Sequence, residues 1–108
     1  MFIYLVITPE IIKKSRRNSN HDSPIGLAIR DAGIEQFSVT PYRAVIKIDG
    51  VVYESKFRGK FRKFQDNYCS GKSLSPFDGE IGFFPLSEIQ QDIRTHIFEK
   101  AKAERTEV

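Results

Sequence analysis

The dipeptide Asp49-Gly50 constrains the fold of this chain more strongly than any other short feature. It separates two runs of strand type, RAVIKI at 43–48 and VVYES at 51–55. Asp-Gly between such runs is a strong signal for a tight β-hairpin, because both turn residues then adopt positive φ angles. A second turn is expected at Thr40-Pro41-Tyr42, and strand-type residues precede it. With the hairpin, these residues predict a three-stranded antiparallel meander over 36–55.

A first strand and two helices are predicted on the N-terminal side of the meander. The run FIYLVI at 2–7 is apolar throughout, which suits a buried strand. Thr8-Pro9-Glu10 then begins a short helix. Asp22 or Ser23 caps a second helix, which ends at Gly33. The apolar face of that helix consists of Ile25, Ala28, Ile29 and Ala32.

A third helix is predicted from aromatic residues at helical spacing. They form one face that is expected to be buried, and they are Phe57, Phe61, Phe64 and Tyr68. Gly71 ends this helix. The segment 74–84 is extended and has room for a further strand. Ser87 and Gln90 have capping-box spacing, so a last helix is expected over 86–104.

These elements predict an α+β fold in one domain, residues 1–108. Strands and helices do not alternate strictly, which favours a small antiparallel sheet over a doubly wound one. We expect about 4–5 strands packed against about 3–4 helices as a single pair of layers. The helix over 86–104 would be an addition to this core, for packing or dimerisation, so the sequence leaves a homodimer open.

Composition bounds the class of protein. The chain has 108 residues, one cysteine and two histidines. It therefore has no internal disulfide and too few ligands for a typical structural zinc site, and no metal or cofactor is expected. Its apolar runs are shorter than the roughly 18 residues of a membrane helix, and no signal peptide is recognisable. We expect a cytoplasmic protein that does not enter a membrane.

Charge is distributed unevenly along the chain. Residues 1–72 carry 13 basic and 7 acidic side chains, a net charge of +6, whereas residues 73–108 carry 4 and 7, a net charge of −3. The candidate site for nucleic acid or another anionic partner is basic and consists of Arg16, Arg17, Lys56, Arg58, Lys60, Arg62 and Lys63. The simpler alternative is a solvated surface. Tyr42 and Arg43, at the tip of a turn, are candidates for contact with a partner.

No catalytic constellation is recognisable. His21 and Asp22 are adjacent in a polar loop, with Ser19 and Ser23 nearby, but no motif places a nucleophile beside them. Cys69 lies near a helix C-terminus, where the helix dipole raises the pKa of a thiol. We therefore expect a protein that is not an enzyme.

Two segments, SPIGLAI at 23–29 and YCSGKSLSPF at 68–77, resemble small proteins of unknown function encoded by phages, prophages and some bacteria. That group has an initial strand, Glu-His-Ile, a Gly and an Arg, a Ser, and then Cys-Pro-Ile-Ala-Leu-Ala-Ile. Its second block reads Phe-Asp-x-Gly, followed by Pro-Phe. The matching positions here are Ile11, Ile12, Ser15, Arg17, Ser19, 23–29, Gly71, Pro76 and Phe77, within residues 5–83.

This chain departs from the pattern at three positions. Ser23 replaces the Cys, Ile11 replaces the His and Cys69 replaces the Asp. If the Cys and His of the group carry out chemistry or bind metal, this chain has lost both. The resemblance implies a viral or mobile-element origin and favours a binding role.

The sequence thus favours a phage-type accessory protein that binds and modulates a host macromolecule, such as a component of host defence. That macromolecule would be a protein or a protein–nucleic acid complex. The alternatives are a nucleic-acid-binding protein that uses the basic residues, and a binding protein that sequesters a nucleotide.

Overall fold

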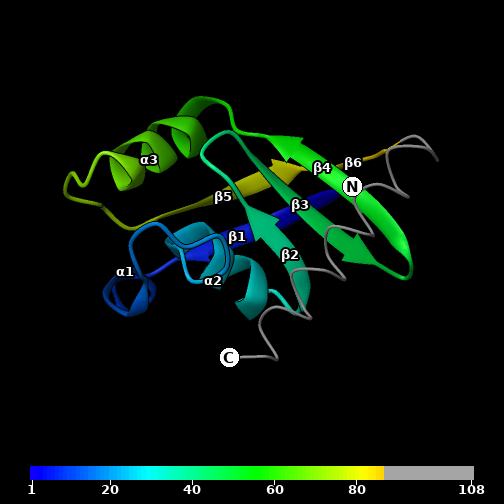
Figure 1. The fold of residues 1–108 in the computed structure, drawn as a ribbon, viewed down its shortest axis with the longest axis horizontal. Helices are drawn as coiled ribbons and strands as arrows, with labels where there is room; N and C mark the ends of the chain where they lie inside the picture. The colour runs from blue at the N-terminus through cyan, green and yellow to red at the C-terminus, as the bar shows by residue number, and fades with distance from the viewer. Residues whose placement is uncertain (87–108) are drawn as a thin grey trace.

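Six strands and three helices make up residues 1–86, the part of the chain that the computed structural model describes (Figure 1). In chain order they are β1 (Phe2–Ile7), α1 (Pro9–Lys14), α2 (Pro24–Asp31), β2 (Gln36–Val39), β3 (Arg43–Ile48), β4 (Val51–Lys56), α3 (Gly59–Cys69), β5 (Phe77–Gly82) and β6 (Phe84–Pro85). The α+β class is confirmed. The helix expected over 86–104 lies, apart from Leu86, outside the described residues.

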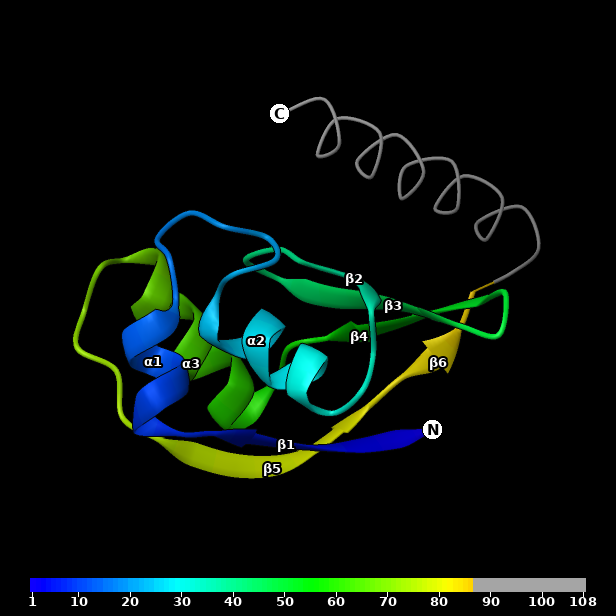
Figure 2. The ribbon, with the colours of Figure 1, turned by 90° about the horizontal axis from the view of Figure 1, so that it is seen from below.

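The strands form two antiparallel sheets. One has the order β2-β3-β4-β6, and the other consists of β1 and β5. Strands β5 and β6 are separated only by Phe83, which is wholly buried, so one stretch of chain passes from the two-stranded sheet to the four-stranded one (Figure 2). The expectation of a single sheet in one pair of layers is therefore wrong, because the segment 77–85 divides its pairing between two partners.

Helix α2 lies between the two sheets. In Figure 2, β1 and β5 form the bottom layer, β2, β3 and β4 form the top, and α2 occupies the space between them. Ile25 and Ile29 of α2 are wholly buried and join the main core. Gly26 permits close packing here, because a Cβ at this position would stand 2.6 Å from the carbonyl oxygen of His21.

Local signals fix the ends of these elements as predicted. The side chains of Thr8 and Ser23 cap α1 and α2 by accepting hydrogen bonds from backbone N–H groups at 3.1 Å. Asp49 and Gly50 have φ angles of 51° and 79°, which confirms the predicted hairpin turn.

The third helix begins later than its aromatic stripe. Phe57 precedes the helix, and its N–H donates a hydrogen bond to the carbonyl of Tyr42 in the meander. Helix α3 begins only at Gly59. All four aromatic residues are buried nevertheless, as expected. The helix ends where Gly71 adopts a φ of 72°.

The first strand is only half buried, which corrects the expectation for residues 2–7. Leu5 and Ile7 face the core, whereas Phe2, Tyr4 and Val6 are 71%, 54% and 48% exposed. The two-stranded sheet has helices on one face only, so alternate side chains of β1 point away from the core. Among residues 1–86, none of the helices has the length and hydropathy needed to span a membrane.

Candidate functional site

Five of the predicted basic residues gather around the start of α3. Lys56 ends β4, Arg58 precedes the helix, and three further cations stand on its first turns; the α3 basic surface is thus Lys56, Arg58, Lys60, Arg62 and Lys63. All five are exposed, while the aromatic residues between them in sequence are buried. The helix therefore separates the two types of side chain, with the rings in the core and the charges in solvent.

The N-terminus of α3 differs from those of the other two helices. Arg58 occupies the N-cap position with extended backbone, and no side chain makes a capping hydrogen bond there. The first N–H groups of a helix have no partner within it and carry partial positive charge. The amides at the start of α3 therefore lie among cations without a side-chain acceptor of the kind that Thr8 and Ser23 supply elsewhere.

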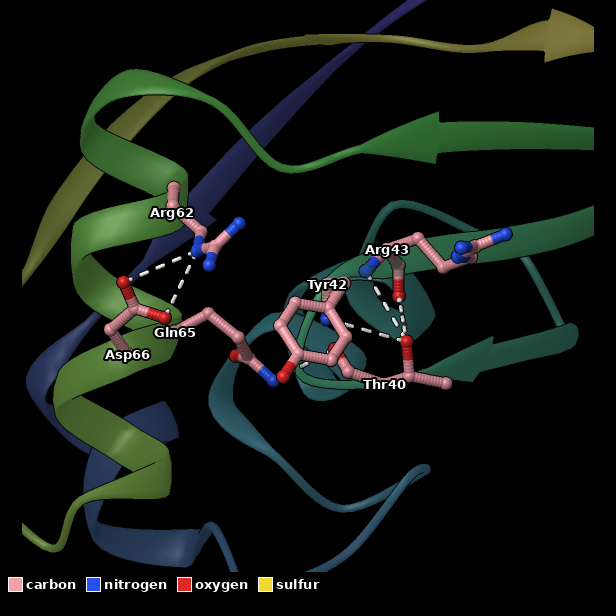
Figure 3. A network of polar contacts seen from close by, with 6 residues as sticks. All are labelled: Thr40, Tyr42, Arg43, Arg62, Gln65 and Asp66. Carbon is pink, nitrogen blue, oxygen red and sulfur yellow. Dashed lines mark hydrogen bonds and ion pairs between the residues drawn. The ribbon is translucent and has the colours of Figure 1, made fainter.

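Tyr42 joins this surface from the turn between β2 and β3. Its ring is 59% exposed, and the guanidinium of Arg62 lies 5.2 Å from the ring centroid. Arg62 is also paired with Asp66 at 3.0 Å (Figure 3). Tyr42 thus presents an aromatic surface beside the cations, as sequence spacing alone could not show.

Polar contacts hold the turn that carries Tyr42. The Thr40 hydroxyl accepts hydrogen bonds from the N–H groups of Tyr42 and Arg43 (Figure 3). From α3, the buried Gln65 donates through Nε2 to the Thr40 carbonyl at 3.2 Å. Sequence reasoning missed Gln65, although its place four residues after Phe61 puts it on the buried face of the helix.

Arg43 does not share the surroundings of Tyr42. Its guanidinium is 2.6 Å from the Glu54 carboxylate on the neighbouring strand, and its side chain points away from Tyr42 in Figure 3. The predicted pair Tyr42 and Arg43 is therefore divided. Tyr42 faces α3, and Arg43 is held in an ion pair over β4.

Arg16 and Arg17 lie at the opposite end of α3. The Arg17 guanidinium donates to the carbonyl of Gly71 at 3.3 Å, and the Tyr68 hydroxyl donates to the carbonyl of Arg16. A helix of 11 residues is about 16 Å long, so these two arginines are a separate group. The seven predicted cations form two clusters, at the two ends of one helix.

A hollow of about 430 Å³ adjoins the α3 basic surface on the side of β4 and β6. Lys56 and Arg58 line it together with Phe84, which is 67% exposed. Lys60 turns the other way, where its ammonium contacts the Asp78 carbonyl and lies 5.7 Å from the centre of the Phe77 ring. That Phe84 lies beside cations could not be predicted from the sequence, because their proximity follows from the pairing of β6 with β4.

The residues weighed for catalysis have structural contacts. Ser23 is fully buried and caps α2. The Asp22 carboxylate pairs with the Arg30 guanidinium at 3.5 Å. The centres of the His21 and Phe37 rings are 5.9 Å apart. Partial desolvation and then the negative charge of Asp66 raise the pKa of the exposed Cys69 thiol. Within residues 1–86, no group of three His, Cys, Asp or Glu side chains could hold a metal ion.

Comparisons with protein-family models, with curated proteins and with solved structures gave no match to this chain.

Proposed function

We propose that this protein is a non-enzymatic binding protein that takes an anionic macromolecule at the start of α3. The observation that carries the proposal is the N-terminus of α3, which lacks a side-chain cap and is flanked by Lys56 and Arg58. A phosphate oxygen can accept hydrogen bonds from such amides, and the helix dipole attracts its charge.

Single-stranded nucleic acid is the anionic partner that fits this surface best. Tyr42 and Phe84 are exposed aromatic side chains on either side of the cations. Bases stack on such rings while lysine and arginine contact the backbone phosphates, which is the usual mode of binding without sequence preference.

This proposal is compatible with the phage-type hypothesis drawn from the sequence. The host macromolecule to be modulated would then be nucleic acid or a complex that contains it. Sequestration of a nucleotide makes a different prediction. A mononucleotide would then displace a bound oligonucleotide as well as a second oligonucleotide does.

The salt dependence of binding tests the electrostatic part. Fluorescence anisotropy with a labelled single-stranded 15-mer, as DNA and as RNA, gives the affinity at 50 and 200 mM salt. If about four phosphates are neutralised, affinity falls roughly 50-fold between these two concentrations. Absence of binding at 50 mM salt would overturn the proposal.

Two substitutions of Arg58 test the helix terminus itself. Arg58→Ser removes the charge and supplies a cap, since the N-cap backbone is already extended. It should stabilise the protein by up to about 1 kcal/mol and yet weaken binding more than Arg58→Gln, which removes the charge alone. Equal affinities of the two variants would show that the amides of α3 take no part.

Tyr42→Ala tests stacking. It should weaken binding by about 1–3 kcal/mol without changing the salt dependence. The triple variant K13Q/K14Q/K72Q is a matched control, because it removes three exposed charges outside the α3 basic surface. A loss in the control equal to that of R58Q/R62Q/K63Q would indicate unspecific attraction to the whole molecule.

A further inference from the structure

Strand β1 is an unprotected sheet edge. Within residues 1–86 it pairs only with β5, so its other edge has no strand beside it. Natural sheets blunt such edges with charged residues, proline or bulges. The sequence of β1, FIYLVI, contains none of these, and three of its six side chains are large, apolar and exposed. An edge of this kind favours the addition of another strand.

The hydrogen bonds at the start of the sheet define which groups face the open edge. Met1 and Phe83 exchange two hydrogen bonds, from the Met1 nitrogen to the Phe83 carbonyl at 3.1 Å and from the Phe83 N–H to the Met1 carbonyl at 2.7 Å. Hydrogen-bonded pairs alternate along an antiparallel ladder. Odd residues of β1 therefore face β5, and the N–H and C=O groups of Phe2, Tyr4 and Val6 point to the open edge.

We propose that a second copy of this chain adds to β1 in antiparallel register, with Tyr4 opposite Tyr4 of the partner subunit. The two β1 strands then join the two-stranded sheets into one four-stranded sheet, β5-β1-β1-β5. In this register Phe2 pairs with Val6 of the partner subunit, and the converse pair forms by symmetry. Every open peptide group of these three residues is satisfied, with six hydrogen bonds between the chains.

The side chains match the same register. Phe2, Tyr4 and Val6 lie on the outer face of the sheet in both copies, so the three cross-strand pairs bring apolar groups directly opposite each other. Shifting the register toward Thr8 would place a strand against the start of α1, and shifting it the other way would leave peptide groups of Val6 unpaired. The register centred on Tyr4 is therefore the one that fits the edge completely.

Charge also favours a second copy over a charged partner strand. β1 carries no charged side chain, while Asp78 and Glu80 stand on the outer face of β5, opposite Val6 and Tyr4. In the joined sheet the two β5 strands are three strand spacings apart, about 14 Å. Because this exceeds the Debye length of about 8 Å at physiological salt, the two acidic rows repel each other weakly.

The size of the contact indicates the strength of the dimer. An aromatic side chain has about 150–250 Å² of surface, so the exposed parts of six side chains and the two strand edges bury at most about 1,000 Å² in total. This lies at the lower limit of specific interfaces. We therefore expect a dimer with a dissociation constant in the micromolar range.

Analytical ultracentrifugation of the full chain between 1 and 200 μM tests the proposal. Wild type should pass from monomer to dimer over this range. Tyr4→Lys places two ammonium groups opposite each other and should raise the dissociation constant at least 100-fold. Tyr42→Lys is the matched control, because it charges an equally exposed tyrosine outside β1 and should leave dimerisation unchanged.

A mixing experiment tests the register. Tyr4→Lys and Tyr4→Glu should each be monomeric alone and should associate when mixed, since the proposal sets position 4 opposite itself. Thermal melting of each variant at 1 μM shows that the monomer remains folded. A wild type that stays monomeric at 200 μM, a Tyr4→Lys variant that still dimerises, or a mixture that fails to associate would each overturn the proposal.

Discussion

Two stretches of this chain each contain residues whose burial is opposite to what their composition suggests. Residues 17–24 are almost entirely polar, yet Ser23 and Pro24 are wholly buried. Strand β1 is entirely apolar, yet its outer side chains are about half exposed or more. The difference teaches that position between or outside the two sheets, rather than polarity, decides burial here.

Hydrogen bonds satisfy polar groups of residues 17–24. The Ser19 hydroxyl accepts from the N–H groups of His21 and Asp22, and the carbonyl of Asn20 accepts from Val39 of β2. Partly buried polar groups that are satisfied in this way cost little. The polar stretch is therefore part of the scaffold, and the apolar strand is the part that remains available to a partner.

The largest expected effect is a difference in the free energy of unfolding between substitutions on the two faces of β1. Leu5→Ala removes a fully buried side chain and should lower the free energy of unfolding by about 2–5 kcal/mol. Val6→Ala, one residue away on the outer face, should change it by less than about 0.5 kcal/mol at 1 μM protein. Urea denaturation measures both, and equal losses would mean that the outer face is covered within the monomer.

The next effect concerns the close approach of the polar loop to α2. Gly26→Ala puts a Cβ 2.6 Å from the carbonyl oxygen of His21, a backbone atom that cannot move without displacing the loop. We expect a loss of about 3 kcal/mol, the upper end for overpacking. Asp31→Ala, at an exposed position of the same helix, is the control; a tolerated Gly26→Ala would show that residues 19–22 are not held against α2.

A smaller effect is expected from the buried cap. Ser23→Ala removes the oxygen that accepts from the N–H of Gly26 and should cost about 1 kcal/mol in thermal denaturation. The affinity of the α3 basic surface should not change, because Ser23 is buried and belongs to another helix. A change in affinity larger than twofold would connect the polar stretch to binding after all.

The smallest effect concerns Cys69, a weakly polar side chain that is exposed like the outer residues of β1. Its raised pKa means less thiolate at a given pH, so alkylation by iodoacetamide should be slower at pH 8 than for free cysteine. Asp66→Asn removes one cause and should shift the pH profile of the rate downward. Unchanged profiles would leave desolvation as the sole cause.

Local features of the fold were predictable from the sequence because their causes are local. The Asp49-Gly50 turn, the caps at Thr8 and Ser23 and the burial of the aromatic stripe all follow from residues within one or two turns of each other. The same is true of the cations at the start of α3, which all lie within residues 56–63 and therefore remain together.

Pairing between distant strands was not predictable. β1 has apolar residues at every position, so no alternation showed that one of its faces would meet solvent. The alternation of β5, with Asp78 and Glu80 on one face, carries that information, but only once β5 is known to be the partner of β1. The separation of Arg16 and Arg17 from the other cations depends in the same way on the docking of a loop at Gly71.

The pairing of β1 with β5 also has a consequence for synthesis of the chain. Ile7 pairs with Phe77 and Phe2 with Gly82, so 70 to 80 residues separate the partners. At about 5–20 residues per second, a ribosome needs roughly 4–16 s to supply them. Until then the uncharged segment FIYLVI lacks its partner strand, so it can pair with the same segment of another unfinished chain.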